Sequence, residues 1–212
     1  MVEFKIDPDK TCLVIVDMTN AFLKPYSRLV VPGGRELIPT LKRLLNACRD
    51  RKICIIFVSM AFRPDRSDIG LHAFFRPEIG AKDILIEGTE EIEFHEEIRP
   101  QKGDVLITKK RFSAFVGTDL DLILRGKGID TIIIGGVAAN MCCQCTAQDA
   151  RMKDYRVIFL SDGNAPMAFP DMGWGVIPTE EIQKVVLTTM AFGFAQVSSV
   201  EEVIRQLGEE SG

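Results

Sequence analysis

The sequence predicts a three-layer α/β/α fold with a six-stranded, mostly parallel sheet. Short runs of apolar, β-branched residues alternate along the chain with longer segments whose apolar residues recur at helical spacing. The short runs are hydrophobic at successive positions, which is typical of strands buried on both faces of a parallel sheet. Strands and helices that alternate in this way belong to the α/β class, in which helices cover both faces of the sheet.

Length and composition favour one domain over residues 1–212. The chain is 46% hydrophobic and 26% charged, which is enough for one well-cored domain and short for two. A formal net charge of −4 without a basic run argues against a nucleic-acid partner. No apolar stretch is long enough to span a bilayer, and the first residues lack the core of a signal peptide, so we expect no membrane partner and a cytoplasmic location. The six cysteines are then expected to be reduced.

The first half of the chain begins with a strand, a helix and a second strand. The apolar run Thr11–Val16 predicts a strand that stops at Asp17. Residues Arg35–Lys52 place their apolar side chains at helical spacing, and Ile53–Ser59 forms the next buried strand. The crossover between the two strands should be right-handed.

From Met60 to Gln101 the sequence shows no clear period. We interpret this stretch as a long functional loop with short extended pieces near Ile84 and Glu93. The third strand is expected over Asp104–Thr108 and ends at Lys109.

The second half repeats the alternation. Gly135 and Gly136 are expected to end the strand before the cysteine-rich segment, and Cys142 to begin the helix after it. The predicted elements are a helix over 119–125, a strand over 131–134, a helix over 142–153, a strand over 156–161, a helix from 179 to about 194, a short strand over 196–198 and a last helix over 200–207.

Three of these strand ends carry groups that fit one chemistry. Asp17, Lys109 and Cys142 supply a carboxylate, a cation and a thiol, and the carboxyl ends of parallel strands frame the ligand crevice of an open α/β sheet. In the first turn of a helix, unpaired N–H groups and the helix dipole favour a thiolate over a thiol. Together these groups are what thiolate catalysis needs.

Other interpretations of these residues stay open at this point. Asp17 also suits a turn or a helix cap, and Cys142, Cys143 and Cys145 also suit a packed helix as small core residues. The cysteine cluster could suggest zinc or an iron–sulfur cluster, but no second cluster supplies the remaining ligands. With only His72 and His95 in the chain, a histidine-rich site is not available either. We therefore expect no metal and no cofactor.

The motifs together resemble one known family, the isochorismatase-like cysteine hydrolases. This family includes nicotinamidases, N-carbamoylsarcosine amidases, and ureidoacrylate and biuret amidohydrolases. The resemblance covers nearly the whole chain. It depends on residues 16–22 (VDMTNAF), 31–34 (VPGG), 109–120 (KKRFSAFVGTDL) and 136–142 (GVAANMC), with Thr146, Asp149 and Ala150.

The resemblance implies a catalytic triad of Asp17, Lys109 and Cys142. It does not select the neighbouring Lys110, Cys143 or Cys145. It also implies a six-stranded parallel sheet and a cis peptide bond between Val137 and Ala138. The backbone N–H groups of Ala138 and Cys142 would form an oxyanion hole.

The sequence also departs from some members of this family. Nicotinamidases bind a metal through an Asp-x-His pattern after the second strand, whereas residues 59–63 read Ser-Met-Ala-Phe-Arg here. Isochorismatases proper cleave a vinyl ether and lack the nucleophilic cysteine, which this chain keeps as Cys142. Both departures favour a metal-free cysteine enzyme.

The function expected from the resemblance is hydrolysis of a linear amide or ureido C–N bond of a small molecule through a thioester, as in N-carbamoylsarcosine amidase. The alternatives are an isochorismatase-type vinyl ether hydrolase, a nicotinamidase, or an inactive α/β protein that binds a metabolite. A homodimer or homotetramer is expected, in which loops of a neighbouring subunit take part in the site. The candidate substrate-binding residues are Phe22, Arg63, Arg111, Phe115, Phe169 and Trp174, with Arg76 as a further candidate for holding a carboxylate.

Overall fold

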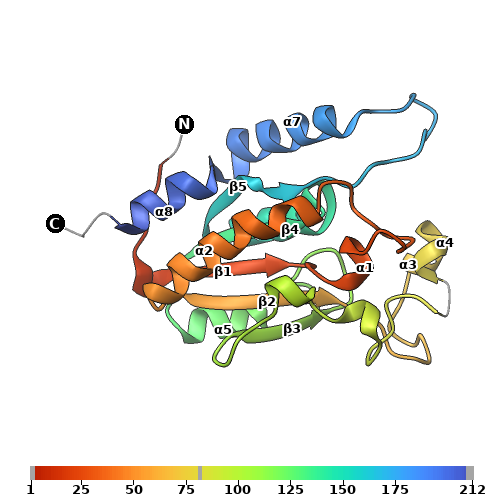
Figure 1. Cartoon of the computed structure of the whole chain (residues 1–212), viewed down its shortest axis with the longest axis horizontal. Coiled ribbons are helices and arrows are strands. Elements are labelled where there is room, and N and C mark those ends of the chain that lie inside the picture. Colours follow the sequence, from red (N-terminus) through yellow and green to blue (C-terminus); the bar gives the residue numbers. More distant parts are fainter. Residues whose placement is uncertain (1–2, 81–82, 209–212) are drawn as a thin grey trace.

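The centre of the molecule is one sheet of six parallel strands in the order β3-β2-β1-β4-β5-β6 (Figure 1). This computed structural model describes residues 3–80 and 83–208. The strands are β1 (Thr11–Val16), β2 (Cys54–Met60), β3 (Val105–Lys109), β4 (Thr131–Val137), β5 (Arg156–Ala165) and β6 (Gln196–Ser198). The predicted fold class is confirmed.

Helices cover both faces of this sheet. The helices are α1 (Asn20–Leu23), α2 (Ile38–Asp50), α3 (His72–Phe75), α4 (Pro77–Gly80), α5 (Leu120–Gly126), α6 (Gln144–Met152), α7 (Thr179–Thr189) and α8 (Val200–Gly208). Short 3₁₀ turns lie at Pro8–Lys10, Arg35–Leu37, Glu90–Ile92 and Glu96–Ile98, and π-helical turns at Ala139–Cys143 and Met190–Phe194. Helices α2 and α8 pack against each other (Figure 1), whereas α7 contacts the π-helical turn before α6, and α6 contacts the π-helical turn after α7.

The strand order reverses direction between β1 and β4. From β1 the chain adds β2 and β3 on one side, and then returns to place β4, β5 and β6 on the other. In open α/β sheets the ligand crevice lies at this switch point, outside the carboxyl ends of the strands. All residues of β1 and β4 are buried, so these two central strands hold the switch point rigidly.

The strand β4 corrects one prediction. Gly135 and Gly136 do not end it, because the strand continues to Val137. A Cβ at Gly136, whose φ is +130°, would lie 2.1 Å from the carbonyl oxygen of Val16. The glycine therefore allows β4 to pass close beside the end of β1, where Asp17 follows.

The strand β5 is also longer than predicted, since it runs past Asp162 to Ala165. Its register against β4 shifts between Ile134 and Gly136. The Asn164 side chain spans this irregularity by donating to the carbonyl oxygens of Ile134 and Leu160, at 3.1 and 2.7 Å. A polar side chain thus satisfies backbone groups that the ladder leaves unpaired.

The irregular stretch after β2 holds short elements only. It contains α3 and α4, and isolated bridges pair Phe62 with Ile86 and Thr19 with Phe94. These bridges lie within two residues of the extended pieces expected near Ile84 and Glu93. A second long connection, residues 166–178, projects from the body between β5 and α7 (Figure 1). Across the described residues, every helix is too short or too polar to cross a membrane.

Candidate active site

Asp17 occupies the turn directly after β1. Its φ of +52° lies in the left-handed region, which aspartate tolerates better than most residues. The Asp17 N–H donates to Val58 at 2.8 Å, and the carboxylate Oδ1 accepts the N–H of Met60 at 2.8 Å. The side chain is fully buried. Two bonds to β2 therefore fix a carboxylate at the switch point of the sheet.

Lys109 and Cys142 meet this carboxylate from β3 and from the turn after β4. The Nζ of Lys109 lies 2.9 Å from Oδ2 of Asp17 and donates to Sγ of Cys142 at 3.2 Å. Lys109 is fully buried, and Cys142 is 5% exposed. The structure thus brings together the three residues predicted from the strand ends, although they lie far apart in the sequence.

The turn that carries Cys142 begins three residues earlier than predicted. A π-helical turn covers Ala139–Cys143, and α6 starts at Gln144. The Thr146 hydroxyl donates to the carbonyl oxygen of Cys142 at 2.7 Å and accepts the N–H of Ala114 at 3.0 Å. This hydroxyl ties the cysteine turn to the segment after β3, which carries Lys109.

Burial and charge correct the protonation state expected for the cysteine. Burial is the main cause that raises the pKa of the Cys142 thiol; the charge of Lys109 opposes this rise, and the Asp17 carboxylate adds to it. Burial alone would lower the pKa of Lys109, but its contacts with Asp17 and Cys142 outweigh burial and raise that pKa. The resting site therefore holds an Asp–Lys ion pair beside a protonated thiol. The start of a helix is not sufficient here to make a thiolate.

A small cavity opens against Cys142. Its volume is about 20 Å³, which is room for about one water molecule. Phe22 and Ala138 line it, as the sequence analysis expected of residues in the site. The other lining residues are Leu29, Met60, Arg76, Ile79, Phe112, Met141 and Met167.

Arg76 is the charged residue among the described residues that line the cavity. Its Nε pairs with the carboxylate of Glu78, and its Nη2 lies 3.7 Å from the thioether sulfur of Met167. A thioether is a weak acceptor for a guanidinium, which has five N–H donors. Arg76 therefore keeps donor capacity at the cavity wall. The irregular loop sequence alone gave no reason to prefer it over Arg63 or Arg111.

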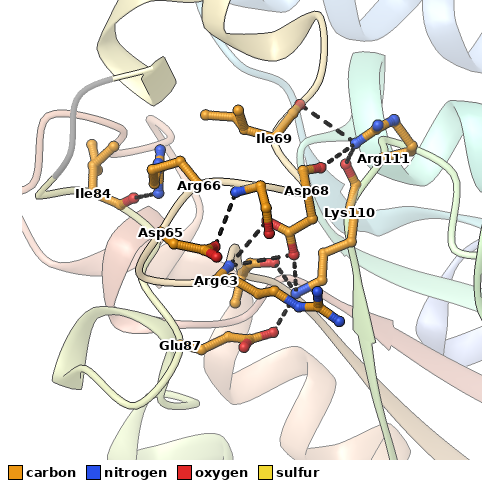
Figure 2. A network of polar contacts seen from close by, with 11 residues as sticks. Arg63, Asp65, Arg66, Asp68, Ile69, Ile84, Glu87, Lys110 and Arg111 are labelled. Carbon is orange, nitrogen blue, oxygen red and sulfur yellow. Dashed lines mark hydrogen bonds and ion pairs between the residues drawn. The ribbon is translucent and has the colours of Figure 1, made fainter.

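Arg63 and Arg111 belong to the polar network of Figure 2, and neither residue lines the cavity. The Arg111 guanidinium donates to the carbonyl oxygens of Asp68 and Lys110, at 3.1 and 2.6 Å. The side chain of Arg63 is exposed, and the backbone N–H of Arg63 donates to the Asp68 carboxylate at 3.0 Å. The network anchors the loop that carries Arg76 to the residues directly after Lys109.

The three remaining aromatic candidates also lie away from the cavity. Phe115 is buried against Tyr155, with ring centroids 5.9 Å apart. Phe169 and Trp174 lie on the projecting loop 166–178, and Trp174 is 89% exposed. Neither residue lines the cavity within this chain.

The backbone before the cysteine has the form that the resemblance implies. The peptide bond between Val137 and Ala138 is cis. The Ala138 carbonyl oxygen accepts the N–H groups of Met141 and Cys143, at 3.0 and 3.1 Å. Within the described part of the chain, no three His, Cys, Asp or Glu side chains are grouped so as to hold a metal ion.

A buried carboxylate, amine and thiol at the switch point of a parallel sheet place the molecule among the α/β enzymes with a cysteine in the site. The family model described as the isochorismatase domain matches residues 11–202. The chain therefore belongs to the isochorismatase family, and it is a hydrolase of the isochorismatase-like cysteine hydrolase type.

Several relatives share most of the chain. The isochorismatase family protein YwoC of Bacillus subtilis is 35% identical and covers 76% of this chain and 81% of its own length. The ureidoacrylate amidohydrolase RutB of Yersinia enterocolitica is 30% identical and covers 90% of this chain and 86% of its own length.

Solved structures show the same fold. The cysteine hydrolase from Pseudomonas syringae pv. phaseolicola has a TM-score of 0.95 at 35% identity, over 98% of this chain and 96% of its own. The N-carbamoylsarcosine amidase from Thermoplasma acidophilum has a TM-score of 0.72 at 27% identity, over 96% of this chain and 99% of its own.

Proposed function

We propose that the protein is a cysteine amidohydrolase that cleaves a linear amide or ureido C–N bond of a small molecule through a thioester. The observation that carries this proposal is the contact of Lys109 Nζ with both Asp17, at 2.9 Å, and Cys142, at 3.2 Å, beside the cavity. Relatives named for ureidoacrylate and N-carbamoylsarcosine hydrolysis support the same class of bond.

The mechanism follows from the protonated resting thiol. As the Cys142 sulfur adds to the substrate carbonyl carbon, its proton moves to the Asp17 carboxylate. The protonated Lys109 stabilises the negative charge that develops on sulfur and stays paired with Asp17. Asp17 then gives its proton to the departing nitrogen as the C–N bond breaks, which leaves an acyl or carbamoyl thioester on Cys142.

Water completes the reaction. Asp17, again a carboxylate, takes a proton from the water that attacks the thioester carbon, and the C–S bond breaks. The sulfur recovers its proton from Asp17. In both halves of the reaction the carbonyl oxygen becomes negative. We assign its stabilisation to the backbone N–H groups of Ala138 and Cys142, because both residues line the cavity.

The cavity favours a small substrate with an anionic end. Its walls are mainly apolar, and Arg76 offers donors that a thioether satisfies only weakly. A carboxylate would accept two parallel hydrogen bonds from a guanidinium. We therefore propose a ureido or amide acid whose carboxylate binds Arg76 while its carbonyl carbon meets Cys142.

Ammonia release from a panel of ureido acids, simple amides, biuret and nicotinamide tests the proposed reaction. When the reaction with a substrate from the panel is quenched in acid during turnover, intact-mass spectrometry should detect an acyl or carbamoyl adduct on Cys142. Turnover of a vinyl ether without any adduct would instead support the isochorismatase-type alternative. Release from nicotinamide alone would support the nicotinamidase alternative, and a panel without turnover would support the inactive binding protein.

A homodimer or homotetramer also remains part of this proposal. The loop 166–178 exposes Met172, Trp174 and Val176, each at least 68%. Large exposed apolar side chains on one projecting segment favour burial against another protein surface. Light scattering should give a mass above that of one chain, and Trp174→Asp should reduce it; a single-chain mass for the unmodified protein would contradict this part.

A further inference from the structure

Two cysteines lie side by side near the amino ends of the strands, at the opposite end of the sheet from the active site. Cys12 and Cys54 are register partners on the neighbouring parallel strands β1 and β2. Their side chains therefore share one face of the sheet and are neighbours across the two strands. Cys12 is fully buried, whereas Cys54 is half-buried. The pair combines one accessible thiol with one sheltered thiol directly behind it.

Cys54 lines an open cavity of about 640 Å³ at this edge. Arg49, which also lines it, pairs with Asp104 at 2.8 Å. Three lysines and one aspartate contribute the other charges to the wall: Lys52, Lys102, Lys127 and Asp9. The positive charges predominate, and reactive cysteines characteristically lie in partly exposed, electropositive surroundings of this kind.

Cys54 differs from Cys145, which is also half-buried, in the pKa of its thiol. The neighbouring Cys12 thiol and the charge of Lys127 lower the pKa of Cys54 to about 7, although burial opposes them. Burial instead raises the pKa of Cys145, which is half-buried like Cys54. Thiolates, not thiols, attack peroxides and disulfides. Cys145 therefore serves as an internal comparison of similar exposure.

We propose that Cys54 and Cys12 form a redox-sensitive thiol pair, separate from the active site, that a hydroperoxide converts to a disulfide. In the first step the Cys54 sulfur attacks one peroxide oxygen, the O–O bond breaks, and an alcohol or water leaves with a proton from solvent. Cys54 is then a sulfenic acid.

In the second step the Cys12 sulfur attacks the Cys54 sulfur. The S–O bond breaks, and the hydroxide leaves as water with the proton of the Cys12 thiol. The two thiols lose two electrons in all, and the peroxide gains them.

The strand geometry permits this bond. Neighbouring parallel strands place register partners about 4.8 Å apart at Cα. Disulfides span roughly 4.4 to 6.8 Å between Cα atoms, so the bridge needs side-chain rotation more than backbone movement.

Hydrogen peroxide added to the full-length Cys142→Ala protein tests the pair without interference from the active-site thiol. After peroxide treatment, free thiols are blocked with N-ethylmaleimide under denaturing conditions, and the protein is digested with trypsin without reduction. We expect a cross-link between the tryptic peptides 11–28 and 53–66, which carry Cys12 and Cys54. Cys48 lies in the separate peptide 44–49, so a link to it would be recognised.

Two variants in the same Cys142→Ala background make the test specific. Cys12→Ser removes the second thiol, so dimedone, which labels sulfenic acids, should label Cys54 and no cross-link should form. Cys54→Ser should show neither product. In the Cys142→Ala protein without a second substitution, peroxide should consume the free Cys54 thiol at least about ten times as fast as the free Cys145 thiol. Equal loss of the two thiols, a link from Cys12 to Cys48, or an unlabelled Cys54 in Cys12→Ser would overturn the proposal.

Discussion

Asn140 and Met167 exchange two hydrogen bonds across the wall of the active-site cavity. The Asn140 Nδ2 donates to the carbonyl oxygen of Met167 at 3.0 Å, and the Met167 N–H donates to Oδ1 of Asn140 at 2.8 Å. Asn140 belongs to the same π-helical turn as Cys142. The pair therefore fixes the start of loop 166–178 relative to the nucleophile.

Loss of this pair should loosen the cavity wall more than the reacting groups. Each hydrogen bond contributes about 1 kcal/mol, so the loss of both in Asn140→Ala should raise KM by roughly 30-fold while kcat changes less. Steady-state kinetics on the substrate found by the ammonia assay measure both constants. Gln148→Ala, further along α6, is the matched control and should leave KM unchanged. A fall in kcat with an unchanged KM would show that Asn140 acts on the chemical step instead.

The three cysteines near the start of α6 should differ sharply in their effect on turnover. Cys142→Ala should reduce turnover by at least about 10³-fold, since Cys142 is the thiol that contacts Lys109 and lines the cavity. Cys143→Ala and Cys145→Ala should retain measurable activity. Cys143→Ala should destabilise the protein more than Cys145→Ala, because Cys143 is fully buried. Ammonia release and circular dichroism test both statements. Substantial turnover by a folded Cys142→Ala protein is incompatible with the nucleophile assignment.

The remaining members of the proposed triad should act as a unit with Cys142. Asp17→Asn and Lys109→Ala should each be nearly inactive, because one removes the proton acceptor and the other leaves a buried carboxylate without its cation. Combination of either change with Cys142→Ala should be no worse than the cysteine change alone. Additive losses in the double variants would indicate independent roles.

Arg76 should decide between anionic and neutral substrates. Charge-assisted hydrogen bonds contribute about 1.5 to 3 kcal/mol, so Arg76→Gln should lower kcat/KM for an anionic substrate by roughly 10- to 100-fold. The uncharged amide analogue of that substrate should lose much less. Arg63→Gln is the matched control, because Arg63 is exposed and does not line the cavity. Equal losses for both substrates would remove the carboxylate role from Arg76.

Buried thiols should make the protein less stable as the pH rises in the alkaline range. Burial raises the pKa of Cys48 to about 12, whereas an unfolded thiol ionises near 8.5. Between these values the unfolded chain releases a proton that the folded chain keeps, so the free energy of unfolding falls as pH rises. Urea unfolding at about pH 7.5 and about pH 9.5 should show a shallower fall for Cys48→Ala. Cys54→Ala should show no such flattening, because the folded pKa of Cys54 is lowered.

Chelation should leave the activity unchanged. The sequence lacks the metal-binding pattern of nicotinamidases, and the proposed mechanism uses only Asp17, Lys109, Cys142 and backbone N–H groups. Exhaustive treatment with a chelator followed by the ammonia assay tests this expectation. Loss of activity that zinc or iron restores would overturn the metal-free assignment.

The reacting groups could be predicted from the sequence because continuous apolar runs identify buried strands. β1 has the predicted bounds, and β3 differs by one residue at each end. Since the carboxyl ends of parallel strands share one edge, Asp17 and Lys109 could be brought together without any knowledge of side-chain positions. The two glycines of β4 were misleading, because Gly136 serves a close approach to Val16 rather than a turn.

The cavity walls could not be predicted in the same way. Arg76 and Met167 come from loops without a period, and their positions depend on the contacts of those loops with other segments. Arg111 and Phe115 follow Lys109 closely, yet one donates to loop carbonyl oxygens and the other packs against Tyr155. Neighbourhood in the sequence did not indicate the direction of either side chain.

The small volume of the active-site cavity sets the order of events in a catalytic cycle. With room for about one water molecule, it must widen before any substrate reaches Cys142. Substrate association should therefore be slower than diffusion and should depend on movement of the segments that carry Arg76 and Met167. Between turnovers the same narrowness limits the approach of bulky reagents to Cys142, whereas Cys54 lines a much larger cavity at the opposite ends of the strands. A bulky hydroperoxide should therefore react with Cys54 before it reaches the active site.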